Sequence, residues 1–372
     1  MAGVWHSRNL VIALCCLAMP EAARADTCKL TPLAALPLLA SVRNIPVVPA
    51  HIAGESTWLI IDTGAVRSLI FAHSADALKL ARNDLRNDLD TVASLGPAPR
   101  PVSTRRGNMA GGASVSTPPE IDTSKIVMLN QRQTEAISVY GTGGQPIREE
   151  TAGQPVRIGR LDFPDVSFLV IPDQSAGDTG VAGMFGMDFL RGYDIELNLS
   201  QHWINLFSQD HCPGKVVYWG EAYLQAPIEI SDTGQIMVEA RLDGQRVQAL
   251  IDTGASHSSI RQGDASWLFG FTAESPGVTA VDSTQAADGA VLTAYRAPFK
   301  TLELAGITFG NPDIHVLPNP KAINQSDHTS LAQRREDAVL TLGVNELSRL
   351  RIYLALRERM LYVTPASPDQ PT

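Results

Sequence analysis

The chain has 372 residues, of which 44% are hydrophobic and 19% are charged, and it carries a formal net charge of −9. This composition is typical of a globular protein, and the length allows two domains of about 150 residues each. An acidic net charge repels nucleic acids and anionic membrane surfaces, so it argues against a function on either.

The first 25 residues have the layout of a cleaved export signal. Arg8 precedes an apolar stretch at 10–19, and Ala23-Arg24-Ala25 provides small residues at a cleavage site. An apolar stretch of this length is too short to anchor the chain in a bilayer. The alternative is a buried N-terminal helix. We expect residues 1–25 to be removed, leaving a periplasmic or secreted protein with a net charge of −10 and no membrane anchor.

Four cysteines are present, and two of them, Cys15 and Cys16, lie in the expected signal. The mature chain would keep Cys28 and Cys212. In an oxidising compartment we expect these two to form a disulfide, with a pair of unpaired structural thiols as the alternative.

Two segments of the chain are copies of each other. Residues 48–70 and 238–260, aligned without a gap, are identical at ten of 23 positions. Each copy alternates apolar and polar residues, turns at 53–55 or 243–245, and continues as a second strand that ends at an aspartate. The pattern predicts a β-hairpin in each copy, with Asp62 or Asp252 in the loop after its second strand.

The region between the copies also repeats, with one insertion. The segment 163–172 corresponds to 309–318. Between its Asp-Thr-Gly motif and this segment, the first half has 44 more residues than the second half has. Residues 82–137 are rich in Asn, Pro, Gly and Ser and indicate an exposed insertion outside the core.

A second pair of hairpins is expected where the two halves have matching spacing. Gly143, in the segment 139–144 (VYGTGG), follows Asp62 by 81 residues, which becomes 37 once the insertion is subtracted. Gly289 also follows Asp252 by 37 residues. We therefore expect a hairpin tip at both glycines.

The halves also end alike. In 184–199 and 341–356 a glycine precedes a short helix-like stretch and then an alternating strand, so each half is predicted to be mainly β. Residues 208–224, broken by Pro213-Gly214, are expected to connect the halves, and residues 365–372 to form a disordered tail.

The repeated Asp-Thr-Gly would create chemistry only if the two copies meet. If the halves pack about a pseudo-twofold axis, Asp62 and Asp252 come together, and two adjacent carboxyls share one proton. Such a pair can hold a water, take its proton as it attacks a peptide carbonyl, and protonate the resulting oxygen.

The neighbouring residues suit the same arrangement. Thr63 and Thr253 can form hydrogen bonds across the axis, and Gly64 and Gly254 let the backbone turn so that N–H groups reach the carboxylates.

Two apolar residues followed by Asp-Thr-Gly-Ala, with Met184-Phe185-Gly186 further on, resemble the clan of pepsin-like and retropepsin-like aspartic proteases over 45–207 and 225–364. The resemblance implies an all-β, bilobal acid-protease fold with two retropepsin-like β-barrel lobes, at 26–207 and 225–364, and short helices. It also implies a monomeric aspartic endopeptidase that acts on a polypeptide, with Asp62 and Asp252 as the catalytic pair and no cofactor.

The same resemblance makes Tyr140, Gly141 and Gly143 part of a flap, a hairpin that closes over substrate. The second half has no matching tyrosine. This departure, together with Val66 after the first motif, leaves a catalytically inactive peptide-binding protein as the alternative function.

Ala65 and Ala255 stand where pepsins usually place a hydroxyl residue that stabilises the aspartate anion. Losing such a hydrogen bond raises a carboxyl pKa, so we expect maximal activity at weakly acidic to neutral pH. No metal-binding sequence motif is present, and we interpret His257 as an ordinary surface or packing histidine.

Overall fold

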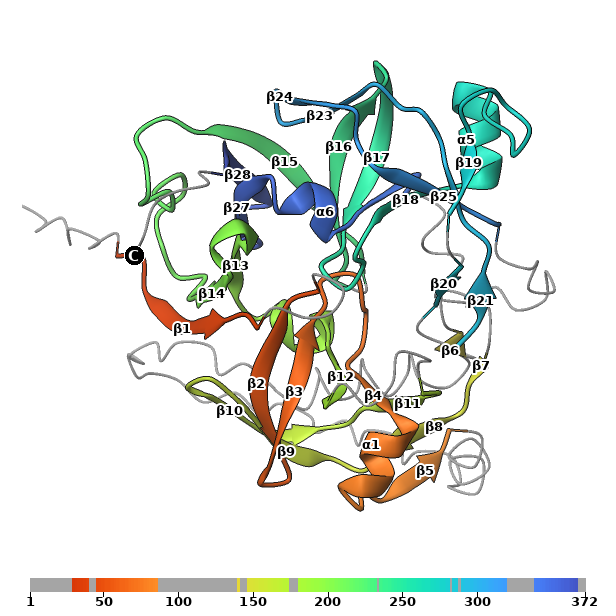
Figure 1. Ribbon diagram of the computed structural model, residues 1–372. Helices are drawn as coiled ribbons and strands as arrows, with labels where there is room; N and C mark the ends of the chain where they lie inside the picture. The colour runs from red at the N-terminus through yellow and green to blue at the C-terminus, as the bar shows by residue number, and fades with distance from the viewer. Residues whose placement is uncertain are drawn as a thin grey trace, which may run out of the picture.

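The structure is a computed structural model that describes residues 29–39, 45–85, 139–140, 146–173, 180–232, 234–281, 283–286, 289–319 and 338–366. The described chain is mainly β, with two large sheets and short helices (Figure 1). No helix in these ranges is long and apolar enough to cross a membrane.

The first half forms a nine-stranded sheet in the order β10-β9-β2-β3-β12-β4-β11-β8-β5. Its strands are β2 (Val47–Ile52), β3 (Glu55–Ile61), β4 (Leu69–Phe71), β5 (Arg82–Asp84), β8 (Glu149–Thr151), β9 (Gln154–Ile158), β10 (Leu161–Val166), β11 (Leu169–Ile171) and β12 (Val181–Phe185). Helices α1 (Ala72–Ala77) and α4 (Met187–Leu190) follow β4 and β12.

The second half builds the same arrangement within a fifteen-stranded sheet. The strands of this half are β15 (Leu224–Ile230), β16 (Ile236–Leu242), β17 (Gln245–Ile251), β18 (Ser258–Arg261), β19 (Thr279–Ala280), β22 (Tyr295–Arg296), β23 (Thr301–Leu304), β24 (Ile307–Gly310), β25 (Ile314–Leu317), β26 (Leu340–Leu342), β27 (Leu350–Ala355) and β28 (Met360–Pro365). Helices α5 (Gln262–Phe269) and α6 (Val344–Leu347) follow β18 and β26.

The two predicted hairpins are present. β2 pairs with β3 and β16 with β17, and both central residues of each turn have positive φ: 52° and 88° at Ala53-Gly54, 45° and 81° at Asp243-Gly244. Turns of this kind match the right-handed twist of the flanking strands. The turns therefore lie where the sequence predicted them.

The duplication extends to strand order. β12 runs parallel to β3 and antiparallel to β4, and β26 has the same relation to β17 and β18. β11 runs parallel to β4 just as β25 runs parallel to β18. The parallel neighbours β12 and β26 cover the edges of β3 and β17, the two strands that lead into the Asp-Thr-Gly motifs.

The halves are joined by a shared sheet. β1 (Pro32–Pro37), β14 (Trp203–Phe207) and β13 (Asp194–Asn198) belong to the first half, and β13 pairs antiparallel with β27 of the second. All five residues of β13 are buried, including Asp194, Glu196 and Asn198. Because both faces of this strand are covered, its polar side chains must find partners inside the protein.

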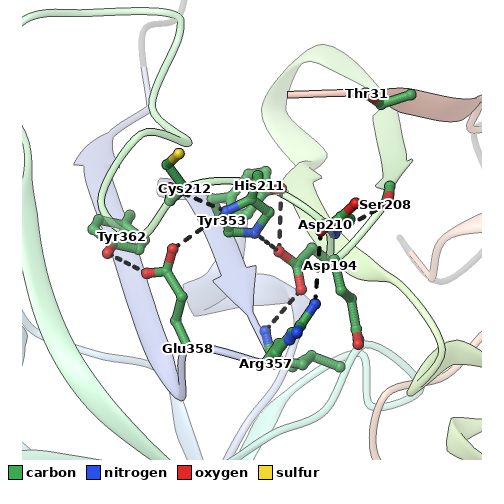
Figure 2. A network of polar contacts seen from close by, with 12 residues as sticks. Thr31, Asp194, Ser208, Asp210, His211, Cys212, Tyr353, Arg357, Glu358 and Tyr362 are labelled. Carbon is green, nitrogen blue, oxygen red and sulfur yellow. Dashed lines mark hydrogen bonds and ion pairs between the residues drawn. The ribbon is translucent and has the colours of Figure 1, made fainter. Parts of the chain in front are cut away.

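The connection 208–224 supplies some of those partners, as Figure 2 shows. His211, whose side chain is 1% exposed, places Nε2 2.5 Å from Asp194 Oδ2 and Nδ1 3.3 Å from Glu358 Oε1. The backbone N–H of Leu356 donates to Asp194, and the hydroxyl of Tyr362 donates to Glu358. The connection therefore fastens a strand of the first half to the turn between β27 and β28.

Three predicted boundaries shift. Residues 82–84, expected at the start of the insertion, form β5 and pair with β8. Leu224, expected in the connection, begins β15 and pairs with Val363, and Pro365, expected in the tail, ends β28 and pairs with Leu350. The signal at 1–25, the rest of the insertion from 86 to 137, and residues 367–372 lie outside the described residues. Cys212 is disulfide-bonded, and its predicted partner Cys28 also lies outside them.

We predict that His211→Ala destabilises the protein by about 3–5 kcal/mol, because it leaves two buried carboxyl groups without the imidazole between them. His73→Ala is the matched control. The His73–Asp173 pair has a similar contact of 2.7 Å but side chains 44% and 51% exposed, so its loss costs less than about 1 kcal/mol. Chemical denaturation under non-reducing conditions measures both, and equal effects would contradict the role assigned to His211.

Candidate active site

The two aspartates of the repeated motif lie in matching loops at the ends of β3 and β17. Asp62 and Asp252 are 7% and 8% exposed. The N–H of Asp62 donates to the carbonyl of Phe185, and that of Asp252 to the carbonyl of Leu342. Each loop is therefore held to the strand that precedes α4 or α6.

The carboxylates receive backbone N–H groups from their own loops. Asp62 Oδ1 accepts hydrogen bonds from the N–H groups of Gly64 and Ala65, both at 2.9 Å. Asp252 Oδ1 accepts one from Gly254, also at 2.9 Å. Hydrogen bonds of this kind hold a carboxylate in one orientation.

The two threonines interlock across the axis, as the sequence predicted. The N–H of Thr63 donates to Thr253 Oγ1 and the N–H of Thr253 donates to Thr63 Oγ1, both at 3.1 Å. Each hydroxyl donates in turn to the carbonyl before the other motif's aspartate, Thr63 to Ile251 at 2.8 Å and Thr253 to Ile61 at 2.6 Å. Both residues are fully buried, so the exchange fixes the two loops relative to each other.

The glycines bring each loop against the opposite aspartate. A Cβ on Gly64 would lie 2.2 Å from the carboxyl carbon of Asp252, and a Cβ on Gly254 would lie 2.3 Å from that of Asp62. Only glycine permits such an approach. Asp62 and Asp252, with Thr63, Gly64, Thr253 and Gly254, thus form one constellation, as the sequence predicted.

A supporting layer was not predicted. Ser68 Oγ donates to Asp188 and accepts from the N–H of Gly186, and Ser258 Oγ does the same with Asn345 and Gly343. These bonds tie the stretch after each motif to the start of the helix that follows β12 or β26. A signal was available, since Ser68 and Ser258 are one of the ten identical positions of the repeat.

One contact breaks the symmetry. Gln235, 4% exposed and just before β16, donates from Nε2 to the carbonyl of Gly64 at 2.9 Å. The corresponding position of the first repeat holds Ile45. Nothing in the sequence pointed to this residue, because its role depends on a contact across the halves.

The backbone forms both hairpins of the second predicted pair. β6 (Val139–Tyr140) pairs with β7 (Pro146–Ile147), and β20 (Thr284–Gln285) pairs with β21 (Val291–Leu292). In Figure 1 they lie on the opposite side of the molecule from β13 and β27. Tyr140 ends β6, whereas the predicted flap residues Gly141 and Gly143 lie outside the described residues. Gly289 has a φ of 82°, as suits the predicted turn.

Comparison with known families supports the same assignment. Residues 238–344 match a family described as aspartyl protease, a range that includes Asp252 and most of the second repeat. The first repeat reproduces this unit in strand order and loop contacts. At the level of the clan, residues 238–344 are related to the aspartyl proteases.

Two solved structures that are similar to this chain share few identical residues with it. Basic 7S globulin from soybean covers 91% of this chain and 96% of its own, with 11% identity and a TM-score of 0.42. Conglutin gamma from lupine seeds, a basic 7S globulin, covers 90% and 95% with the same identity and TM-score. Likenesses this weak carry no argument about function. No curated protein matches the chain.

We predict that Gly64→Ala disrupts the site, because the added methyl group would overlap the Asp252 carboxyl. The free energy of unfolding should fall by about 1–3 kcal/mol, as for other overpacked interiors. Gly220→Ala is the control, since a Cβ there meets nothing within 4 Å and the backbone needs no positive φ. Thermal unfolding of both variants tests this, and an unaffected Gly64→Ala protein would contradict the close approach.

We predict a pH-dependent gain from Asp188→Asn. Burial raises the pKa of Asp188, although the hydrogen bonds from Ser68 oppose the shift. A raised folded-state pKa means that stability is fully present below the unfolded pKa and is lost as pH rises through the folded pKa. The variant's Tm relative to wild type should therefore increase between pH 4 and pH 7.

The second repeat allows the opposite substitution as a matched test, because Asn345 contacts Ser258 there as Asp188 contacts Ser68 in the first repeat. Asn345→Asp should lower Tm increasingly over the same pH interval, since it introduces a partly buried carboxyl group and removes the amide that donates to the carbonyl of Asp313. A pH-independent difference in both variants would show that ionisation at this position does not matter.

Proposed function

We propose that this protein is an aspartic endopeptidase that hydrolyses peptide bonds with a water activated by Asp62 and Asp252. The observation that carries the proposal is the reciprocal approach of each glycine to the other motif's carboxyl group, locked by the threonine exchange. A scaffold for peptide binding alone would not need two buried carboxyl groups held together.

The chemistry follows from two acids that share one proton. The ionised carboxylate takes a proton from the water as its oxygen attacks the peptide carbonyl carbon, and the protonated partner donates to the carbonyl oxygen. As the C–N bond of the gem-diol then breaks, the aspartic acid that took the water proton gives it to the leaving amine, and a gem-diol hydroxyl returns a proton to the other aspartate. The backbone N–H groups on Asp62 Oδ1 hold that carboxyl group in position during these transfers.

The substrate class in this proposal is an extended polypeptide. The hairpins β6–β7 and β20–β21 would close over it, with Tyr140, Gly141 and Gly143 in the first as flap residues. Exposed edges of such hairpins can pair with a substrate backbone. We also propose that the protein is exported to the periplasm or secreted, acts as a monomer, and needs no cofactor.

We predict that Asp62→Asn and Asp252→Asn each lower kcat/KM on a denatured protein substrate by at least about 10³-fold, since each removes a group that transfers protons. Asp162→Asn is the control, because the Asp162 side chain is 80% exposed on β10. Cleavage followed by mass spectrometry gives the readout, and a statine-type transition-state mimic should inhibit the wild type.

The alternative function has a different outcome in the same experiment. A protein that binds unfolded polypeptide equally well with and without Asp252→Asn, and cleaves it in neither form, is a peptide-binding protein on the same fold. Assays across pH also test the expected optimum at weakly acidic to neutral pH.

A further inference from the structure

Three residues of the second half form a cluster that has no part in the proposed proteolysis. His257 lies just before β18, and Asp313 and His315 lie just before and in β25. One ligand atom from each lies within 4.8 Å of the others. His257 Nδ1 is 3.7 Å from Asp313 Oδ2, and His315 Nε2 is 3.8 Å from Asp313 Oδ1.

We propose that His257, Asp313 and His315 bind a divalent transition-metal cation, with zinc as the best-suited ion. Two imidazole nitrogens and one carboxylate oxygen are a common zinc ligand set, which leaves a further coordination position for solvent. Zinc–ligand bonds of about 2.0–2.2 Å around a tetrahedral ion need ligand atoms about 3.4 Å apart. The two histidine–aspartate contacts exceed this spacing by a few tenths of an ångström, whereas the widest separation, within 4.8 Å, would have to shorten by up to about 1.4 Å.

The hydrogen bonding of the cluster points to a missing partner. His315 Nε2 is buried and has no hydrogen-bond partner, and Asp313 Oδ1 is buried and forms an ion pair with Arg296 without an aligned hydrogen bond. Buried polar atoms without partners are uncommon and costly.

The ligands are held on rigid elements. The N–H of Asp313 donates to Glu346, and its carbonyl accepts from Asn345, so both bonds come from α6. His315 is in register with Ser259 on β18 and with Arg296 on β22. The rings of His257 and His315 are stacked with centroids 4.3 Å apart and an interplanar angle of 14°, which directs both toward the same carboxylate.

The first repeat shows that the fold itself does not require this cluster. The sequence offset and the strand register place Arg67, Ser167 and Leu169 where the second half has His257, Asp313 and His315. Arg67 forms an ion pair with Glu150, which stands opposite Leu169 as Arg296 stands opposite His315. The same place in the scaffold is thus filled by one simple ion pair in one half and by three ligand side chains in the other.

Arg296 is the competing cation. Its guanidinium contacts both oxygens of Asp313, at 2.6 and 3.1 Å. The Arg296 side chain is 52% exposed, and an exposed ion pair contributes little, so the guanidinium can move into solvent when a metal binds. Removal of Arg296 should therefore strengthen metal binding.

Isothermal titration of the full chain with Zn²⁺ in chelator-free buffer tests the proposal, together with the spectrum of the Co²⁺ form. We expect one ion per chain and an absorption spectrum of four-coordinate Co²⁺. His257→Ala and His315→Ala should each weaken binding by at least about tenfold, because each removes one of three ligands. Arg296→Gln should bind more tightly than wild type, and His73→Ala should bind as wild type does.

Thermal unfolding distinguishes a variant that folds but has lost the metal site from one that fails to fold. Zinc that binds the folded state should raise the Tm of the wild type and of His73→Ala but not of His257→Ala, whose half-exposed side chain can be removed with little effect on the fold. Equal zinc affinity in the wild type, His257→Ala and His315→Ala, or no binding by the wild type, would overturn the proposal. These readouts do not depend on proteolysis.

Discussion

The exchange of hydrogen bonds between Thr63 and Thr253 is the constraint on which the site depends. Each threonine receives an N–H from the other and donates its hydroxyl to a carbonyl in the opposite strand, so neither loop can move without its partner. A bond of this kind contributes about 1 kcal/mol, but an unpaired buried donor or acceptor costs more. The arrangement is therefore stable only when both halves are in place.

The shared sheet makes that exchange possible. β13 and β27 pair across the halves, and the His211 network fastens the connection to both. β3 and β17 belong to different sheets, so the pairing of β13 with β27 brings the halves together and the threonine exchange fixes the two loops against each other. The shared strands β13 and β27 and the two hairpins β6–β7 and β20–β21 lie on opposite sides of the molecule in Figure 1.

Much of the fold and of the candidate site could be predicted because the sequence contains an internal repeat. The turns at Ala53-Gly54 and Asp243-Gly244, the helices after Gly186 and Gly343, and the meeting of the two motifs all follow from local pattern plus internal repetition. The motif letters alone would not have been enough. Asp232-Thr233-Gly234 repeats them a third time, yet Asp232 is exposed in the turn between β15 and β16, whereas Asp62 and Asp252 are buried.

The sequence could not reveal contacts that depend on how distant segments pack. Gln235 reaches Gly64 only because the halves dock, and the polar residues of β13 are buried only because a connection covers their sheet. His257 looked ordinary because its neighbours Asp313 and His315 come more than fifty residues later. They meet through the parallel pairing of β18 with β25, a long-range contact that no local pattern encodes.

In a duplicated fold, residues that are the same in both halves indicate what the fold requires, and residues that differ indicate what one half has changed. Ser68 and Ser258 are the same in both halves, so the fold constrains them, whereas Asp188 and Asn345 differ in charge while keeping one hydrogen-bonding role. The same comparison separates the paired aspartates, which occur in both halves, from the cluster at His257, which occurs in one. Symmetric residues build the common site, and the differences between the halves show where each half has its own chemistry.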